Sequence, residues 1–200
     1  MRISRRKTFQ QSPLGYAEVG ASADPDLLRF PPNKAVVFEK RIKLGSSEER
    51  FVSVVSALMT WQAHKQADCF VSATPAATAA PNQEQLFSAT GEPYAMIGDQ
   101  VSLRVRKQTV NWKVLRAISA AQRAQLMLGS LADEPITGEL LLSVHLREDG
   151  SVWGLTRGFV HPEWRLFAIG RSAQLKAIVA TNLEVLEALR PTAAAASGEE

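Results

Sequence analysis

The sequence predicts a single α+β domain in which an antiparallel sheet is covered on one face by two helices. Three observations lead to this fold class. Several segments between residues 99 and 160 alternate apolar and polar side chains, as half-buried strands do. No helical pattern separates these segments in the sequence, which excludes parallel crossovers. Amphipathic helical patterns stand instead before residue 67 and after Pro162, where each can cover the sheet.

The first predicted strand covers residues 35–44, because polar residues alternate with apolar ones near its end. Gly45 ends the strand, and the serine three residues before Glu49 is the capping-box pattern of a helix start. We expect this helix to continue to about Gln66. Its apolar residues are spaced by three and four, which gives one core-facing stripe: Phe51, Val54, Val55, Leu58 and Trp61.

Later strands are indicated by a period of two. Residues 101–105 and 140–146 both alternate in this way. Asp149-Gly150 predicts a hairpin turn into a strand over residues 151–159, because both central positions of the favoured turn need positive φ. Residues 112–120 and 123–131 are expected to form another antiparallel pair. The last element is a helix that ends before Pro191 and has apolar residues at helical spacing: Leu175, Ile178, Val179, Leu183, Leu186 and Leu189.

The chain is expected to form one domain over residues 35–190. Residues 1–34 contain several proline and glycine breakers and predict an irregular leader lying across the core. Residues 74–98 are rich in Ala, Thr, Pro and Ser, which indicates a mobile loop insertion. Residues 191–200 lack large apolar side chains, so we expect a disordered tail.

Composition limits the class of protein. A chain of 200 residues with 46% hydrophobic and 22% charged residues is typical of one globular domain. Cys69 is the only cysteine, which excludes a disulfide scaffold and a zinc site of paired thiolates and fits a reducing compartment. We therefore expect a cytoplasmic protein. No uninterrupted apolar run reaches about 18 residues, which excludes a transmembrane helix on length.

Charge and motifs give no sign of a cofactor or a metal. The net charge of +3 is below what nucleic-acid-binding domains usually carry, so the basic residues near Trp112 are interpreted as a solvated strand face. The sequence has no nucleotide-binding loop. The three histidines lie on separate predicted elements without carboxylate or thiol neighbours at a ligand spacing, so no metal site is predicted.

Five residues are candidates for contacting a ligand. Trp61 and His64 lie three positions apart on the first helix, so their side chains are neighbours. Glu139 opens a strand after a glycine and is a candidate base at the mouth of a cavity. Tyr16, in the leader, is placed to close a pocket. Each has a structural alternative: a core anchor for Trp61, a flanking side chain for His64, a backbone-bonded or arginine-paired carboxylate for Glu139, and plain packing for Tyr16.

The fifth candidate is Trp153. On a strand that begins at Ser151 it shares a face with Leu155, opposite Gly154 and Gly158. We expect the tryptophan face to be the inner one, which would make its ring a pocket wall, because a large ring on an uncovered outer face leaves an apolar patch exposed. In the alternative, the glycines face a helix and the ring lies on the outer surface.

Several short phrases, taken in order, resemble the domain-of-unknown-function family 1990. The likeness covers roughly residues 14–189, and it is carried by residues 15–21, Phe51 with Trp61 and His64, residues 129–131, Pro135, Gly138-Glu139 and residues 149–153. Members of the family usually have a tyrosine at Leu128, a histidine near Glu134 and Ser-Arg-Pro at residues 160–162, so this chain resembles a divergent member. The element order is also similar to the helix-grip fold of START-like domains. That resemblance implies a curved antiparallel sheet that grips a long C-terminal helix and leaves an apolar cavity.

Three functional hypotheses follow. The first is a module that binds a small apolar or amphipathic ligand in a cavity of roughly 300–1,000 Å³ between the sheet and the C-terminal helix, lined by Trp61 or Trp153. The second is an enzyme acting on such a ligand, with Glu139 or His64 as general acid or base. The third is a protein-interaction or structural domain that uses the 74–98 insertion or the basic leader.

Overall fold

The computed structural model describes residues 14–76, 84–105, 108–132, 134, 136–162 and 171–191. A short 3₁₀ helix, η1 (Ala21–Ala23), lies in the leader. The elements that follow are β1 (Val36–Ser46), α1 (Glu48–Met59), α2 (Gln62–Gln66), β2 (Cys69–Thr74), β3 (Gln100–Val105), β4 (Gln108–Ala120), β5 (Arg123–Ser130), β6 (Ile136–Leu146), β7 (Ser151–Pro162) and α3 (Arg171–Ala188).

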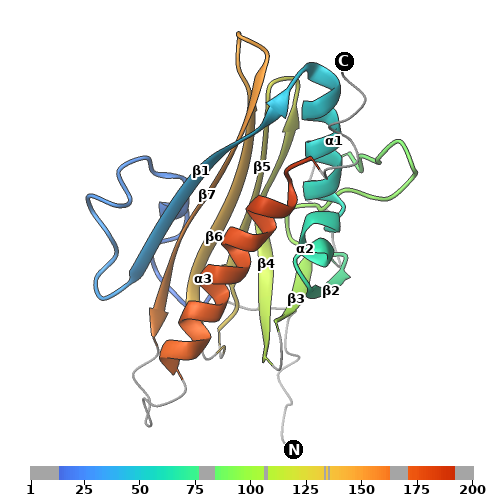
Figure 1. Ribbon diagram of the computed structural model, residues 1–200. Coiled ribbons are helices and arrows are strands. Elements are labelled where there is room, and N and C mark those ends of the chain that lie inside the picture. The colour runs from blue at the N-terminus through green and yellow to red at the C-terminus, as the bar shows by residue number, and fades with distance from the viewer. Residues whose placement is uncertain are drawn as a thin grey trace, which may run out of the picture.

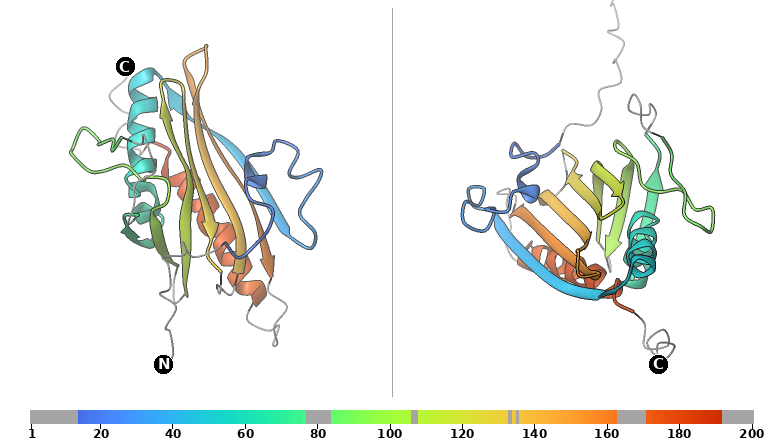
Figure 2. Two further views of the ribbon diagram at one scale, coloured as in Figure 1. Left: turned by 180° about the vertical axis from the view of Figure 1, so that it is seen from behind. Right: turned by 90° about the horizontal axis from the view of Figure 1, so that it is seen from above.

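The strands form one seven-stranded sheet in the order β1-β7-β6-β5-β4-β3-β2. Every neighbouring pair is antiparallel. The sheet is curved, and α3 lies across its hollow side, while α1 contacts β1, β5 and β6 and α2 contacts β2 (Figures 1 and 2). We call the side that α3 covers the inner face and the opposite side the outer face. The α+β fold class with a gripped C-terminal helix, predicted above, is confirmed.

Alternation along the strands separates the two faces. In β6, Leu140, Leu142 and Val144 point inward and join the main core with side chains from the helices, including Phe51 and Leu186. Each of these β6 residues is at most 3% exposed. The sheet therefore buries one apolar face against helices, which is the main source of its stability.

Gly154 allows the C-terminal helix to approach the sheet closely. A Cβ atom at this position would lie 2.8 Å from Cδ1 of Leu186 on α3 and 2.8 Å from Cδ1 of Leu44. A methylene group does not fit in that space, so the glycine is needed where α3 crosses β7. The glycines of β7 thus face inward, and Trp153, one residue away, faces outward.

The leader forms a second layer on the outer face (Figure 2). Leu14 bridges to Leu131, and Leu27 is only 2% exposed. Side chains that are buried on the outer face, apart from the main core, include Met127, Leu141 and Phe159. The leader residues from 14 onward therefore shield the part of the outer face that lies over the start of β6 and the end of β7.

Two elements differ from the sequence expectation. The helix expected to run to Gln66 ends at Met59 and restarts at Gln62, because Trp61 adopts a left-handed conformation with φ of 66°. The start of α1 is capped by Ser47 and not by Ser46, the serine of the expected capping box; the Ser47 side chain accepts a hydrogen bond of 3.2 Å from the amide of Arg50. Strand β2 was not predicted, since it is a short edge strand with mostly exposed side chains.

Some expectations fall outside the described residues. Residues 1–13 of the leader, residues 77–83 of the insertion and residues 192–200 of the tail are among them. The expected mobility of residues 77–83 and the expected disorder of the tail therefore stay predictions. In the described ranges, no helix has both the length and the apolar character needed to cross a membrane.

Candidate functional site

Glu139 is enclosed by hydrogen-bond donors from the leader. Its Oε1 accepts from the Tyr16 hydroxyl at 2.9 Å and from the Gly20 amide at 2.5 Å. Its Oε2 accepts from the Ser22 amide at 3.1 Å and from the Ser22 hydroxyl at 2.8 Å. Glu139 is 0% exposed, and a carboxylate has about four lone-pair sites, so these donors fill its capacity. The side chain holds the leader on the outer face and has no site left to act as a base.

Tyr16 is fixed by the same contacts. Its ring packs edge-on against Phe159 with a centroid distance of 5.5 Å, and its hydroxyl passes over Gly129, where a Cβ atom would collide with it. Burial, followed by the nearby Glu139 carboxylate, raises the pKa of Tyr16 well above its ordinary value. The hydroxyl therefore stays protonated and donates to Glu139. The structural alternatives described for Tyr16 and Glu139 account for both residues.

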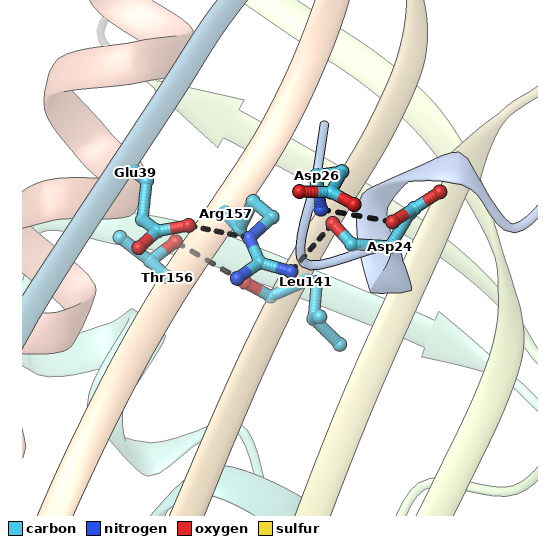
Figure 3. A network of polar contacts seen from close by, with 6 residues as sticks. All are labelled: Asp24, Asp26, Glu39, Leu141, Thr156 and Arg157. Carbon is cyan, nitrogen blue, oxygen red and sulfur yellow. Dashed lines mark hydrogen bonds and ion pairs between the residues drawn. The ribbon is translucent and has the colours of Figure 1, made fainter. Parts of the chain in front are cut away.

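A second clamp holds the leader further along β7 (Figure 3). Nε of Arg157 is 2.6 Å from Oε2 of Glu39 on β1, and Nη1 donates a hydrogen bond of 2.7 Å to the carbonyl of Asp24. The Asp24 carboxylate accepts from the Asp26 amide at 2.8 Å, which tightens the turn after η1. Because Arg157 is only 5% exposed, its charge needs both partners. These contacts tie the leader to β7 and β1.

Trp61 and His64 lie together on the inner side of the sheet. Their rings meet edge-on with a centroid distance of 5.1 Å. Both side chains are buried, and Nδ1 of His64 has no hydrogen-bond partner among the described residues. Burial lowers the pKa of His64 to about 4, so the imidazole is neutral at physiological pH. Trp61 is a core anchor, and His64 carries an unused polar atom inside the core.

A small cavity remains between the inner face and α3. It has a volume of about 30 Å³, and its lining is mostly apolar, with two polar side chains from α3: Leu103, Val110, Trp112, Leu140, Ala177, Ile178, Thr181 and Asn182. It is much smaller than the expected cavity, and neither Trp61 nor Trp153 lines it. The expectation that Trp153 forms a wall of this cavity is wrong, because Gly154, not Trp153, faces α3.

Trp153 instead lines a groove of about 290 Å³ near the β6–β7 hairpin. Arg147 lies over its ring at 4.5 Å from the centroid, and the groove also contains Arg41, His145 and Leu155. The Trp153 indole donates a hydrogen bond of 3.0 Å to the Ser151 hydroxyl. This half-buried ring is therefore fixed in orientation and open to solvent on the outer face.

The structure thus separates the five sequence candidates into three places. Tyr16 and Glu139 form a structural clamp, Trp61 and His64 belong to the inner core, and Trp153 lines the outer groove. Sequence reasoning missed Thr181 and Asn182, which lie among the apolar residues of the last helix, and the arginines around Trp153. The alternation pattern placed Arg41 and Arg147 among the polar positions of their own segments. It did not show that these segments would lie on either side of β7, which carries Trp153. Among the described residues, no three histidine, cysteine, aspartate or glutamate side chains gather as a metal site would require.

Comparisons with known proteins agree with this architecture. The family described as a domain of unknown function (DUF1990) matches residues 15–178. Among curated proteins, none matches this sequence. Among solved structures, the hypothetical protein jhp0584 from Helicobacter pylori is similar with a TM-score of 0.53 at 11% identity, over 82% of this chain and 93% of that one. That likeness supports the fold.

Two other structures have lower similarity. The Aha1 dimer from Colwellia psychrerythraea has a TM-score of 0.42 at 14% identity, over 78% of this chain and 96% of that chain. Ara h 8.0201 has a TM-score of 0.43 at 9% identity, over 78% of this chain and 97% of that chain.

Proposed function

We propose that this chain, which belongs to the DUF1990 family of domains of unknown function, binds a small apolar or amphipathic molecule between the inner face of the sheet and α3. The family itself assigns no activity. The proposal therefore rests on the chemistry of the space that α3 covers.

The observation that carries the proposal is the pair of polar side chains at the cavity. Thr181 and Asn182 are 6% and 7% exposed, and both line an otherwise apolar space with Leu103 and Trp112. The Asn182 amide nitrogen donates to the carbonyl of Ile178 at 3.0 Å. An apolar pocket with a few convergent polar groups is the usual arrangement of a small-molecule site. We infer that these groups contact the polar end of the ligand.

The ligand must enlarge the cavity when it binds. A volume of about 30 Å³ holds one or two water molecules, since each needs about 10–15 Å³. Among the described residues, the C-terminal end of α3 is held to other elements by polar contacts. Lys40 on β1 pairs with Glu187 at 2.6 Å, and Arg50 on α1 donates to the carbonyl of Leu189, just after α3. We infer that this end stays fixed while the half containing Ala177 and Ile178 moves away from the sheet.

The test uses a matched pair of substitutions on α3. Ala177→Met fills the cavity, and Ala180→Met places the same side chain on the exposed side of the helix. The probe is N-phenyl-1-naphthylamine, a neutral apolar dye that fluoresces when it leaves water. We expect the dye to bind wild type and the Ala180→Met protein alike and the Ala177→Met protein at least about tenfold more weakly, a loss of about 1.4 kcal/mol.

Native mass spectrometry of the purified protein gives an independent measurement. We expect a copurified small molecule on wild type that is lost in the Ala177→Met protein. Equal dye binding by all three proteins, with no copurified mass, would show that the space under α3 is core and not a binding site.

The enzyme alternative gains no support from the positions of its two candidate groups. Glu139 lies under the leader on the outer face, and His64 lies on α2 at the inner face. The two side chains do not converge on one cavity, as a shared acid–base role would require. The interaction hypothesis for the insertion and the leader stays a prediction.

A further inference from the structure

The outer face carries a second place where a ligand fits, on the opposite side of the sheet from α3. Register aligns four residues there in one row across four strands: Arg123 on β5, His145 on β6, Trp153 on β7 and Lys43 on β1. The adjacent row contains Gln125, Ser143, Leu155 and Arg41 in the same strand order. Arg147 reaches the same place from the end of β6. Side chains on one face of adjacent strands lie close enough to act together.

The positive charge of this surface is not neutralised by ion pairs. Among the described residues, no carboxylate lies within ion-pair distance of Arg41, Arg123 or Arg147. Burial, together with these arginines, lowers the pKa of His145, which agrees with a positive potential at the groove. Asp149 at the hairpin turn interacts electrostatically with Arg147 and Lys43, and its carboxylate accepts hydrogen bonds from the Ser151 amide at 2.9 Å and hydroxyl at 2.5 Å.

The groove is also ordered by hydrogen bonds from both sides. Ser151 connects the Trp153 indole to Asp149, which fixes the plane of the ring. Nε2 of His145 lies 2.9 Å from the Ser143 hydroxyl, which accepts from Gln125 at 3.5 Å. Gln125 and Ser143 are 3% and 1% exposed, so these connections lie beneath the surface. Preorganised side chains reduce the entropy lost on binding.

We propose that this groove binds a small molecule in which a planar apolar group carries a carboxylate or a phosphate. The planar group contacts Trp153 and Leu155, and the oxyanion contacts the guanidinium groups of Arg41 and Arg147, whose planar forks can each bind two oxygens of a carboxylate or a phosphate. The volume of about 290 Å³ suits one small ligand and is near the lower end of pockets known for such ligands, about 300 Å³. The site is separate from the space under α3.

The test compares aromatic anions with a neutral aromatic amide and with an anion that has no ring. The probes are 2-naphthoate, 2-naphthyl phosphate and the neutral 2-naphthamide, with inorganic phosphate as a fourth, and binding is followed by calorimetry and by the NMR signal of the Trp153 indole N–H. We expect either or both of the two aromatic anions to bind and to shift that signal, and we expect the amide and inorganic phosphate to bind at least about tenfold more weakly. The choice between carboxylate and phosphate identifies the headgroup.

Substitutions locate the site. Arg41→Gln and Arg147→Gln should each weaken anion binding at least about fivefold, and the cavity-filling Ala177→Met change under α3 should leave it unaltered. Arg104→Gln is the matched control, because Arg104 lies over Phe70 at 4.6 Å in the same way that Arg147 lies over Trp153, but at the other edge of the sheet. The Arg104→Gln protein should bind as wild type does.

Three results would overturn the assignment. The first is absence of anion binding at millimolar concentration, and the second is equal affinity for 2-naphthoate and 2-naphthamide. The third is tighter binding of a single-stranded oligonucleotide than of the small anions, with loss of that binding in salt, which would make the surface a polymer site.

Discussion

The hydroxyl of Tyr16 donates a hydrogen bond of 2.9 Å to Glu139, a residue 123 positions later in the chain. This contact joins the leader to the middle of the sheet. Because Glu139 also accepts from Gly20 and Ser22, one buried side chain organises the whole turn around η1. A residue that was a candidate base is therefore a determinant of stability.

Replacing Glu139 by alanine should destabilise the protein by about 3–5 kcal/mol, because several buried donors lose their acceptor at once. Tyr16→Phe removes one donor and should cost about 1–2 kcal/mol. Urea unfolding measures both changes, with Glu18→Gln as an exposed control. A loss below about 1 kcal/mol for Glu139→Ala would mean that the leader does not depend on this contact.

Gly154→Ala should destabilise the protein by about 1–3 kcal/mol, because the added methyl group meets Leu186 and Leu44. The double substitution with Leu186→Ala should be less destabilising than the sum of the single changes, since the smaller side chain makes room for the methyl group. Thermal or urea unfolding of the four proteins in this cycle gives the coupling. Strict additivity would show that α3 does not press on β7 here.

His64 should make stability depend on pH. The folded imidazole has a pKa of about 4 against an ordinary value of 6.5, so the unfolded chain binds a proton that the folded protein excludes. The free energy of unfolding should therefore be highest above pH 6.5. It should fall progressively as pH is lowered toward 4, by about 3 kcal/mol in total. Urea unfolding from pH 7 to 4 measures this loss.

His64→Leu should reduce that pH dependence relative to wild type, and the matched substitution of the more exposed His161 by glutamine should not. If the wild-type and His64→Leu proteins lose stability in parallel between pH 7 and 4, the imidazole is not protected from protonation by the core.

Anion binding at the Trp153 groove should strengthen as pH falls from 7 toward 5.5. Burial, followed by Arg123, Arg41 and Arg147, lowers the pKa of His145 below its ordinary value of 6.5, so the groove gains this proton only as pH falls below that value. Lys43 and Asp149 also lie near Trp153, and hydrogen bonds from Ser151 hold the pKa of the Asp149 carboxyl below its ordinary value, so this group stays ionised over the range. One added charge should raise the affinity for 2-naphthoate about 3–5-fold.

Calorimetry at the two pH values gives that ratio. His145→Asn keeps a polar group beside Ser143 and should remove the increase. An unchanged increase in the His145→Asn protein would assign the effect to another group.

The sequence was sufficient for most of the sheet, because residues 101–105 alternate, residues 140–146 alternate except at Leu141, and Asp149-Gly150 marks the turn between two strands. It was insufficient where local preference and tertiary structure conflict. A tryptophan rarely adopts positive φ, so the break at Trp61 has no signal in the sequence. Alternation shows that Trp153 and Gly154 lie on opposite faces of the strand, but it does not show which of the two faces α3 covers. The orientation of Trp153 therefore could not be predicted.

The contacts of the candidate sites were less predictable than the strands. Tyr16 and Glu139 were singled out separately, but only the fold brings residues so distant in the chain into contact. Thr181 and Asn182 look like surface residues in a helix, and their burial follows from the position of α3 over the sheet.

The pairing of β1 with β7 also sets a condition on synthesis. Strand β1 ends at Ser46, and the strand that covers one of its edges begins at Ser151, roughly a hundred residues later. At about 5–20 residues per second, a ribosome needs several seconds or more to deliver that partner. During this interval the nascent chain exposes a strand with one apolar face and an unpaired edge, which is a surface that chaperones recognise and that other nascent chains can join.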